Sequence, residues 1–348
     1  MALRVIQGDC RETLRTLDER SVQCVVTSPP YYGLRDYGVN GQIGLEDSPE
    51  KYVSELVSVF REVRRVLKDD GTLWLNLGDS YYNYRPGGTS QVKQSLAKHQ
   101  GAVVETTSKR NKVFEGIKEK DLIGIPWMVA FALRADGWYL RQDIIWAKPN
   151  PMPESVTDRC TKSHEYIFLL TKNKSYYYDQ DAIREPAKDS SVARLAQDAE
   201  NQIGSDRVPG KTNGRMKAVK FGGSKYGESK DVKHNTKSGK EWVPTQADGA
   251  LYITANKKTV WTVATKPYTE AHFATFPPEL IEPCILAGSK EGDIVLDPFN
   301  GSGTTGAVAL KHRRHYIGCE LNPDYIELTH RRFSKVQPVL FQTREGVG

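Results

Sequence analysis

The chain has 348 residues, of which 38% are hydrophobic and 26% charged, and its mean hydropathy is −0.56. No apolar run approaches the roughly 18 residues of a membrane span, and the N-terminus lacks the apolar core of a secretory signal. The five cysteines are scattered, with no Cys-x-x-Cys pair, which argues against a disulfide framework and against a structural zinc site. We therefore expect a cytoplasmic protein without a metal, built on one large core with or without an appended lobe.

Positive charge is concentrated in the middle of the chain. Between Ile183 and Lys258 there are fifteen Lys and Arg against nine Asp and Glu, a surplus equal to the net charge of +6 of the whole chain. Such a balance permits a polyanionic partner without requiring one.

The first elements alternate between strands and helices. The short apolar run Leu3–Ile6 predicts a strand, and the helical pattern of Arg11–Leu17 predicts a short helix. Val22–Val26 is almost wholly apolar, as a strand buried on both faces of a parallel sheet would be, and the two prolines that follow end it. Ser48 is a good helix N-cap, and the apolar spacing behind it predicts an amphipathic helix that ends near Gly71.

Regular patterns continue, with interruptions, to the end of the chain. The βαβαβ alternation of the first part predicts a parallel, helix-covered sheet. The regular apolar pattern is lost over residues 80–121, which predicts a long loop. Residues 187–240 are poor in large apolar side chains. The remaining expected strands are Thr72–Leu77, Trp138–Trp146, Tyr166–Leu170, Asp293–Leu296 and Tyr316–Cys319, and the expected helices are Pro126–Ala135, Pro278–Ala287, Thr304–His312 and Pro323–Phe333.

A glycine-containing segment follows one of the C-terminal strands. Asp297–Thr305 reads Asp-Pro-Phe-Asn-Gly-Ser-Gly-Thr-Thr and lies where a strand ends and a helix begins, the crevice at which open α/β sheets bind ligands. Gly301 and Gly303 allow the backbone to approach a ligand closely. The next strand ends at Glu320, whose carboxylate is placed to accept hydrogen bonds from both hydroxyls of a ribose.

A second segment follows the buried strand near the N-terminus. Thr27-Ser28-Pro29-Pro30-Tyr31 presents a hydroxyl, a proline carbonyl and an aromatic ring at the carboxyl end of that strand. Taken alone, the segment also fits a Pro-Pro turn with tyrosines in the core. Its pairing with the glycine-containing segment argues against that interpretation.

Both segments, in this order, resemble the β group of S-adenosylmethionine-dependent DNA amino-methyltransferases. The resemblance implies a Rossmann-like methyltransferase fold: a mostly parallel twisted sheet with helices on both faces, a circularly permuted motif order and an inserted target-recognition region. It implies S-adenosyl-L-methionine as cofactor, with S-adenosyl-L-homocysteine as its product. Asp297, Gly301 and Gly303 would hold the methionine part, Thr304 or Thr305 its carboxylate, and Glu320 the ribose, with Phe299 in the same loop.

Three residues elsewhere match other parts of the family pattern. His272 and Phe273 resemble the segment that packs on the cofactor, and Asp9 resembles the acidic residue that meets the adenine ring. Core packing for the first two and a turn cap for Asp9 remain alternatives. Residues 75–79, 143–150 and 164–166 are similar to the family without an assigned role. For Trp146 and Lys148 the plainer interpretation is a sheet-edge strand and a surface charge.

The catalytic role implied for the proline-containing segment has a direct chemical reason. The lone pair of an exocyclic amino group is delocalised into the base. Acceptance of its hydrogens by the Ser28 hydroxyl and the Pro29 carbonyl would free that lone pair for attack on a methyl group. A base in duplex DNA must first be flipped out, and Tyr31, with Tyr32, offers the surface on which it would lie. We thus expect Ser28, Pro29, Pro30 and Tyr31 to be catalytic.

The resemblance also divides the chain and indicates double-stranded DNA as its partner. We expect a catalytic half at 1–182, a target-recognition insert at 183–262 and a cofactor half at 263–348. Phosphate contacts come mainly from Lys and Arg, and the insert supplies Arg207, Lys211, Arg215, Lys217, Lys220 and Lys225. A solvated linker is the alternative for this stretch.

Several questions remain open at the level of sequence. Ser at the start of the catalytic segment is more typical of cytosine-N4 enzymes, but adenine-N6 enzymes are more numerous. Cytosine and adenine therefore both remain candidates for the target base. The recognised sequence, a cognate restriction enzyme and a homodimer are equally open. The alternatives are RNA methylation on the same scaffold and a DNA-binding protein that has lost catalysis.

Overall fold

The computed structural model describes residues 3–34, 38–82, 116–187, 246–247, 250–251, 254–265 and 276–336. The chain forms two compact units, residues 1–183 with 258–348, and residues 184–257. In the second unit, β6 (Glu185–Pro186) pairs antiparallel with β9 (Thr254–Ala255), and β7 (Gln246–Ala247) pairs with β8 (Ala250–Leu251). Within the described ranges, no helix combines the length and hydrophobicity that crossing a membrane requires.

The first unit is built on one eight-stranded sheet with the order β1-β12-β11-β2-β3-β5-β4-β10. Neighbouring strands are parallel except where β5 pairs antiparallel with β3 and β4. The strands are β1 (Leu3–Gln7), β2 (Val22–Thr27), β3 (Leu67–Leu77), β4 (Tyr139–Ala147), β5 (His164–Thr171), β10 (Val260–Thr262), β11 (Ile294–Asp297) and β12 (His315–Glu320).

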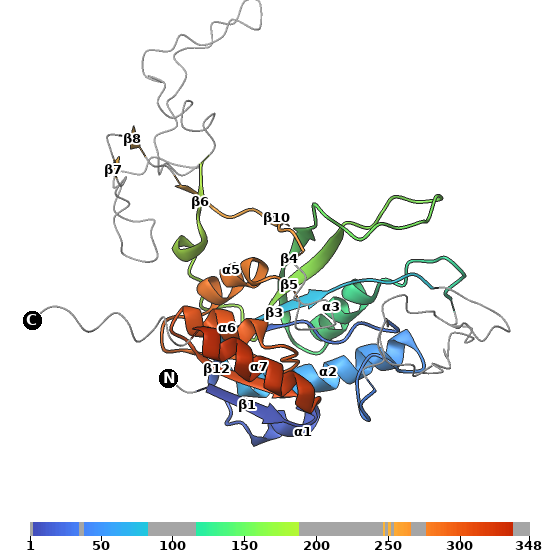
Figure 1. The fold of residues 1–348 in the computed structure, drawn as a ribbon, viewed down its shortest axis with the longest axis horizontal. Helices are drawn as coiled ribbons and strands as arrows, with labels where there is room; N and C mark the ends of the chain where they lie inside the picture. The colour runs from blue at the N-terminus through green and yellow to red at the C-terminus, as the bar shows by residue number, and fades with distance from the viewer. Residues whose placement is uncertain are drawn as a thin grey trace, which may run out of the picture. The chain divides into compact units, whose positions relative to one another are not determined.

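Helices cover both faces of this sheet (Figure 1). One face packs against α1 (Cys10–Thr13), the 3₁₀ helix η1 (Leu14–Thr16), α2 (Pro49–Val66) and α3 (Ile125–Ala135). The other packs against α5 (Pro278–Gly288), α6 (Thr304–Lys311) and α7 (Pro323–Val336), with η2 (Asp181–Ile183) beside them. β2 serves both cores because its side chains alternate: Val25 lies in the first, and Cys24 and Val26 in the second. The predicted mostly parallel, helix-covered sheet is confirmed.

Among the boundaries that differ from the sequence-based prediction, two are informative. The helix expected to reach Gly71 ends at Val66, because Leu67 already has extended backbone and pairs with Val22 of β2. Pairing with a neighbouring strand thus outweighs the polar composition of residues 68–70, which enter β3. The expected helix Arg11–Leu17 is one α-helical turn, capped by Asp9, followed by a 3₁₀ turn.

Candidate functional site

The candidate residues lie along one edge of the sheet, at the carboxyl ends of neighbouring parallel strands. Asp9 follows β1, Glu320 ends β12, Asp297 ends β11, and Thr27 ends β2 immediately before Ser28. Adjacent strands are about 4.8 Å apart. The two segments identified in the sequence are therefore neighbours in space, although about 270 residues separate them.

Asp297 joins the two segments directly. Its Oδ1 accepts a hydrogen bond from Thr27 Oγ1 at 2.6 Å and another from the Phe299 backbone N–H at 3.0 Å. Its Oδ2 accepts from Thr305 Oγ1 at 2.8 Å. Asp297 is 2% exposed, and burial raises its pKa to about 6, although these hydrogen bonds lower it. In this structure the carboxylate is bonded within the protein and orders the loop. The expected contact of Asp297 with the methionine part stays a prediction.

The two glycines of the loop serve different purposes. Gly301 has φ +52° and Gly303 φ +77°, both in the left-handed region. A Cβ at Gly303 would lie 2.7 Å from Thr329 Cγ2, so packing against α7 requires this glycine. Among the described residues, a Cβ at Gly301 would approach only the Phe299 carbonyl oxygen, at 3.9 Å, so these residues leave open space there. Phe299 itself is partly buried and packs against the first core.

The threonines expected to hold a carboxylate are engaged within the protein. Thr304 Oγ1 accepts a hydrogen bond from Arg332 Nη1, and Thr305 Oγ1 donates to Asp297. The Ser302 hydroxyl is buried and has no hydrogen-bond partner among the described residues. Ser302 and Thr304 thus each keep a hydroxyl proton for donation to an anionic group, whereas Thr305 donates its proton to Asp297. The position of Ser302 between the two glycines is the sequence signal that could have identified it.

Glu320 is hydrogen-bonded to the backbone of this loop. Its Oε2 accepts from the Gly301 N–H at 2.7 Å and its Oε1 from the Asn322 N–H at 2.8 Å. Burial raises the pKa of Glu320 to about 7. Each carboxylate oxygen has a second lone pair, so the geometry leaves acceptors for the hydroxyls of a ribose.

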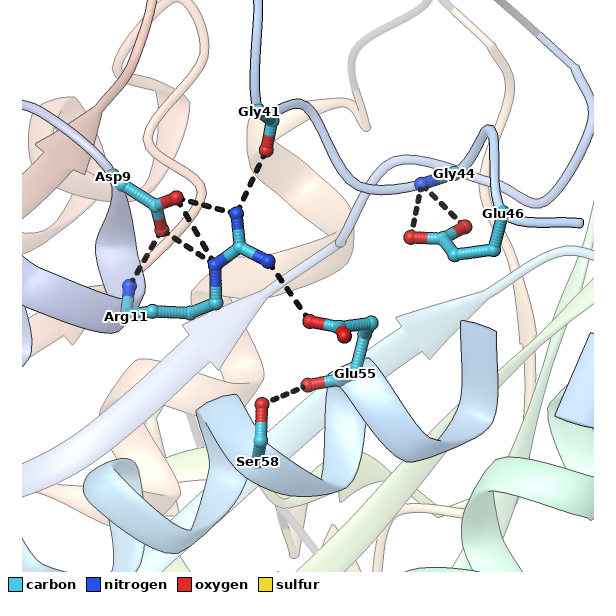
Figure 2. Close-up of polar contacts among 7 residues, drawn as sticks. All are labelled: Asp9, Arg11, Gly41, Gly44, Glu46, Glu55 and Ser58. Atoms are coloured by element: carbon cyan, nitrogen blue, oxygen red, sulfur yellow. Dashed lines mark hydrogen bonds and ion pairs between the residues drawn. The ribbon is translucent and has the colours of Figure 1, made fainter. Parts of the chain in front are cut away.

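Asp9 caps a helix and is paired with an arginine (Figure 2). It accepts from the Arg11 backbone N–H at 2.8 Å, and its two oxygens receive the Arg11 guanidinium. Burial raises the pKa of Asp9, but the hydrogen bonds from Arg11 outweigh burial and lower it overall. The same guanidinium reaches Glu55 Oε2 at 2.8 Å and the Gly41 carbonyl at 3.0 Å. The turn-cap interpretation of Asp9 thus describes its contacts in this structure.

The Arg11 guanidinium also holds the loop that follows the catalytic segment, through its hydrogen bond to the Gly41 carbonyl. Near Gly41, Glu46 accepts two hydrogen bonds from the Gly44 N–H (Figure 2). Gly44 in turn accepts from the Gly33 N–H at 2.8 Å, and a Cβ at Gly44 would lie 3.2 Å from the Tyr31 carbonyl. The backbone around Tyr31 is therefore fixed by the loop against which it packs.

The catalytic segment itself leaves Ser28 and Tyr31 partly accessible. Pro29 is buried and Pro30 half-buried, and the Tyr52 hydroxyl donates to the Pro30 carbonyl at 2.8 Å. No described residue donates to the Pro29 carbonyl, which leaves it as an acceptor beside the Ser28 hydroxyl. The pKa of Tyr31 is raised well above its usual range, mainly by burial and secondly by the negative charge of the nearby Glu165.

Four residues outside the predicted site position the Tyr31 side chain. Its hydroxyl lies 2.6 Å from Glu165 Oε2 and 3.2 Å from Asn76 Oδ1. Lys148 forms an ion pair with Glu165 Oε1. A Cβ at Gly78 would lie 2.5 Å from Tyr31 Cε2, so only glycine lets β3 end against this ring.

The interpretation of Trp146 and Lys148 as a sheet edge and a surface charge is wrong. β4 is not an edge strand, because β10 pairs with it on the side opposite β5. Trp146 is 3% exposed, and the Lys148 ammonium lies over the Trp146 ring. Sequence similarity had marked residues 75–79, 143–150 and 164–166 without a role. The structure brings Asn76, Lys148 and Glu165 together at Tyr31.

The remaining predicted residues divide into two groups. Tyr32 is 8% exposed and packs against Tyr52, so contact with a base would require its ring to move. The others lie outside the described residues, together with most of the expected 80–121 loop: His272, Phe273, Arg207, Lys211, Arg215, Lys217, Lys220 and Lys225. Within the described part of the chain no cluster of three His, Cys, Asp or Glu is arranged for a metal, and the five cysteines are free.

Comparison with known proteins extends along almost the whole chain. Residues 22–331 match the family model N6_N4_Mtase, described as DNA methylase. Type II methyltransferase M.Cfr9I of Citrobacter freundii is 45% identical over 94% of this chain and 86% of its own length. Type II methyltransferase M.SmaI of Serratia marcescens is also 45% identical, over 94% of this chain and 90% of its own length.

Solved structures share the fold. PvuII DNA methyltransferase, a cytosine-N4-specific enzyme, superposes with a TM-score of 0.58 at 17% identity, covering 97% of this chain and 91% of its own. TTHA0409 of Thermus thermophilus, complexed with S-adenosyl-L-methionine, superposes with a TM-score of 0.54 at 23% identity, covering 97% of both chains.

Proposed function

Since this chain belongs to the N6/N4 family of DNA methylases and is a DNA amino-methyltransferase that uses S-adenosyl-L-methionine, we propose that it methylates the N4 amino group of cytosine as the modification enzyme of a type II restriction-modification system. The observation that carries the mechanism is the Thr27–Asp297 hydrogen bond, because it holds the catalytic segment beside the loop for the methyl donor. Two relatives named type II methyltransferases, each 45% identical, support the assignment to that type of system. A bacterial cytoplasm is the location that this role implies.

The residues present fit the methyl donor. The open space at Gly301, the unpartnered Ser302 hydroxyl and the remaining acceptors of Glu320 are the features that would hold its amino-acid and ribose parts. Asp9 would lie toward the adenine. When bound, the donor supplies an electrophilic methyl group on a sulfonium. Asp297 and Thr305 keep the loop in shape for it.

The catalytic segment acts on the base. The amino group would donate its hydrogens to Ser28 Oγ and to the Pro29 carbonyl, which draws the nitrogen toward a tetrahedral geometry and frees its lone pair. Tyr31, held by Glu165 and Gly78, would present its ring to the flipped base. Serine at the first position of the motif is more typical of cytosine-N4 enzymes, and on this we base the choice of cytosine.

We assign target recognition to the insert at 183–262, which includes the compact unit 184–257. Its excess of Lys and Arg suits phosphate contacts. The division into a catalytic half at 1–182 and a cofactor half at 263–348 belongs to the same proposal, and a homodimer remains a prediction from the family.

The base is tested by a nucleoside digest of DNA methylated by the purified enzyme, read by mass spectrometry. We expect N4-methylcytosine from duplex DNA and no transfer to RNA of the same sequence. N6-methyladenine would overturn the choice of base. Equal methylation of the RNA would overturn the assignment of DNA as substrate.

A further inference from the structure

The side-chain oxygens of Ser28, Tyr31 and Glu165 form a chain of hydrogen-bonding groups that begins at the catalytic serine. Ser28 Oγ lies 3.4 Å from the Tyr31 hydroxyl oxygen, which lies 2.6 Å from Glu165 Oε2. Ser28 and Tyr31 follow β2, whereas Glu165 is the second residue of β5, two strands away across the sheet. The first of these distances is at the limit for a hydrogen bond, and catalytic hydrogen bonds often shorten only when the substrate is bound.

The directions of these hydrogen bonds follow from the number of protons. A tyrosine hydroxyl has one proton, and the carboxylate at 2.6 Å is a nearer and stronger acceptor than Asn76 Oδ1 at 3.2 Å. Tyr31 therefore donates to Glu165, and its oxygen is left to accept from Ser28. With its own proton directed at Tyr31, Ser28 Oγ turns lone pairs outward, as acceptance from an amino group requires.

Glu165 is held as a fixed acceptor at the end of this chain. Lys148 is paired with Oε1, and the side chains of Glu165 and Lys148 are only 14% and 18% exposed. Asn76 Nδ2 donates to Oε2 at 3.3 Å and also to the Tyr166 carbonyl. A second positive charge nearby is Lys162, whose pKa is lowered by burial. These contacts leave the glutamate little freedom to turn away from Tyr31.

We propose that Glu165 takes up, through Tyr31 and Ser28, the proton that the target amino group loses. The inference rests on the proposed function, which places that amino group at Ser28. Once the nitrogen carries the methyl group it has four bonds, a positive charge and one proton in excess. That proton moves to Ser28 Oγ as the serine proton moves to Tyr31 and the tyrosine proton moves to Glu165 Oε2. The base becomes neutral, both hydroxyls are regenerated, and Glu165 ends as a neutral carboxylic acid.

The direction of this transfer is chemically favourable. A nitrogen whose lone pair is taken up by a fourth bond is no longer conjugated with the ring, and it is a far stronger acid than a carboxylic acid. A carboxylate paired with Lys148 therefore still accepts its proton. Tyr31 stays protonated between turnovers, because burial and Glu165 both disfavour the phenolate. It relays a proton and does not act as a base itself.

The test compares Glu165→Gln with the parent enzyme in single-turnover methyl transfer to duplex DNA. Glutamine keeps an oxygen that accepts from Tyr31 but cannot take its proton. We expect transfer to slow by about a hundredfold, with calorimetric binding of S-adenosyl-L-methionine and binding of DNA unchanged. Because glutamine preserves the hydrogen bond to Tyr31, a residue that only positions the ring would not produce this loss of rate.

Two further variants keep the outcome decisive. Tyr31→Phe retains the ring but breaks the relay, so it should be as slow as Glu165→Gln, and the double variant should be no slower than either. If Glu165→Gln does not fold, Tyr31→Phe alone decides. Glu282→Gln is the matched control, because Glu282 is a partly buried carboxylate bonded to Lys311 at 2.8 Å, and Lys311 lies at the opposite end of α6 from the cofactor loop. It should transfer at the parental rate.

Single-turnover rates equal to the parent in Glu165→Gln, or in Tyr31→Phe, would overturn the relay. The proposed function would survive that result if Ser28→Ala still transferred at least about tenfold more slowly than the parent. It would fail if Ser28→Ala were fully active, whatever Glu165→Gln did.

Discussion

Replacing Asp297 by asparagine separates its structural role from its charge. The carboxylate is 2% exposed and is bonded to Thr27, Phe299 and Thr305, with no cation in the set. An amide would reproduce these contacts. Its oxygen would accept from Thr27 and Phe299, and its NH₂ would donate to Thr305 Oγ1, which would turn its proton to the Val26 carbonyl, 3.2 Å away. The loop should therefore keep its shape without the charge.

The size of the effect follows from the pKa of Asp297, which burial raises from its ordinary value of 3.8 to about 6. A carboxyl whose pKa is raised by folding binds its proton more tightly in the folded state. Its contribution to stability is thus complete below about pH 4 and is lost as pH rises through about 6. A shift of about 2 units corresponds to about 3 kcal/mol. Asp297→Asn should accordingly stabilise the protein by up to about 3 kcal/mol at pH 8 and by less than about 1 kcal/mol at pH 4.

The assay is urea unfolding of both proteins at several pH values between 4 and 8, with calorimetric titration of S-adenosyl-L-methionine at pH 8. Asp297→Asn should bind the cofactor, whereas Asp297→Ala, which leaves the donors of the loop unpaired, should not. The reasoning would be refuted by a stability difference between Asp297→Asn and the parent that does not change with pH. Loss of cofactor binding in a well-folded Asp297→Asn would instead mean that the charge itself is needed.

Three further predictions concern the cofactor loop, the tyrosine ring and the insert. Gly301→Val should abolish S-adenosyl-L-methionine binding, because its side chain would fill the open space at the loop; normal titration by calorimetry would contradict this. Gly78→Ala should displace the Tyr31 ring and lower methyl transfer while leaving cofactor affinity intact, and a parental rate would show that the ring position does not matter. Alanine at three lysines of the insert should weaken DNA binding and reduce the salt slope by about 0.9 per lost phosphate contact, and an identical slope would make this stretch a solvated linker; the lysines are Lys217, Lys220 and Lys225.

The sheet and its ligand-binding edge were predictable because their signals are local. Apolar runs such as Val22–Val26 indicate buried parallel strands, and a proline or glycine segment directly after a strand indicates the edge where ligands bind. The structure confirms that the strand before Ser28 and the strand before Pro298 are hydrogen-bonded neighbours. Sequence order alone does not determine this pairing.

The environment of Tyr31 was not predictable, because its partners come from distant strands. Glu165 is 134 residues away and Asn76 is 45 residues away, and the turn of the chain that makes β5 antiparallel brings the start of that strand to the catalytic edge. The hydrogen bond that Thr304 makes was not predictable for a similar reason. Its hydroxyl is bonded to Arg332 of α7, a contact that depends on how two helices pack.

The central claim is that Ser28 and Tyr31 act on the base, while the loop at 297–305 holds the methyl donor. The most direct test is single-turnover transfer of a tritiated methyl group from S-adenosyl-L-methionine to duplex DNA by the parent, Ser28→Ala and Tyr31→Ala, with cofactor affinity measured on the same preparations. Both variants should transfer at least about tenfold more slowly than the parent, with nearly unchanged cofactor affinity. Parental transfer rates in both would contradict the account.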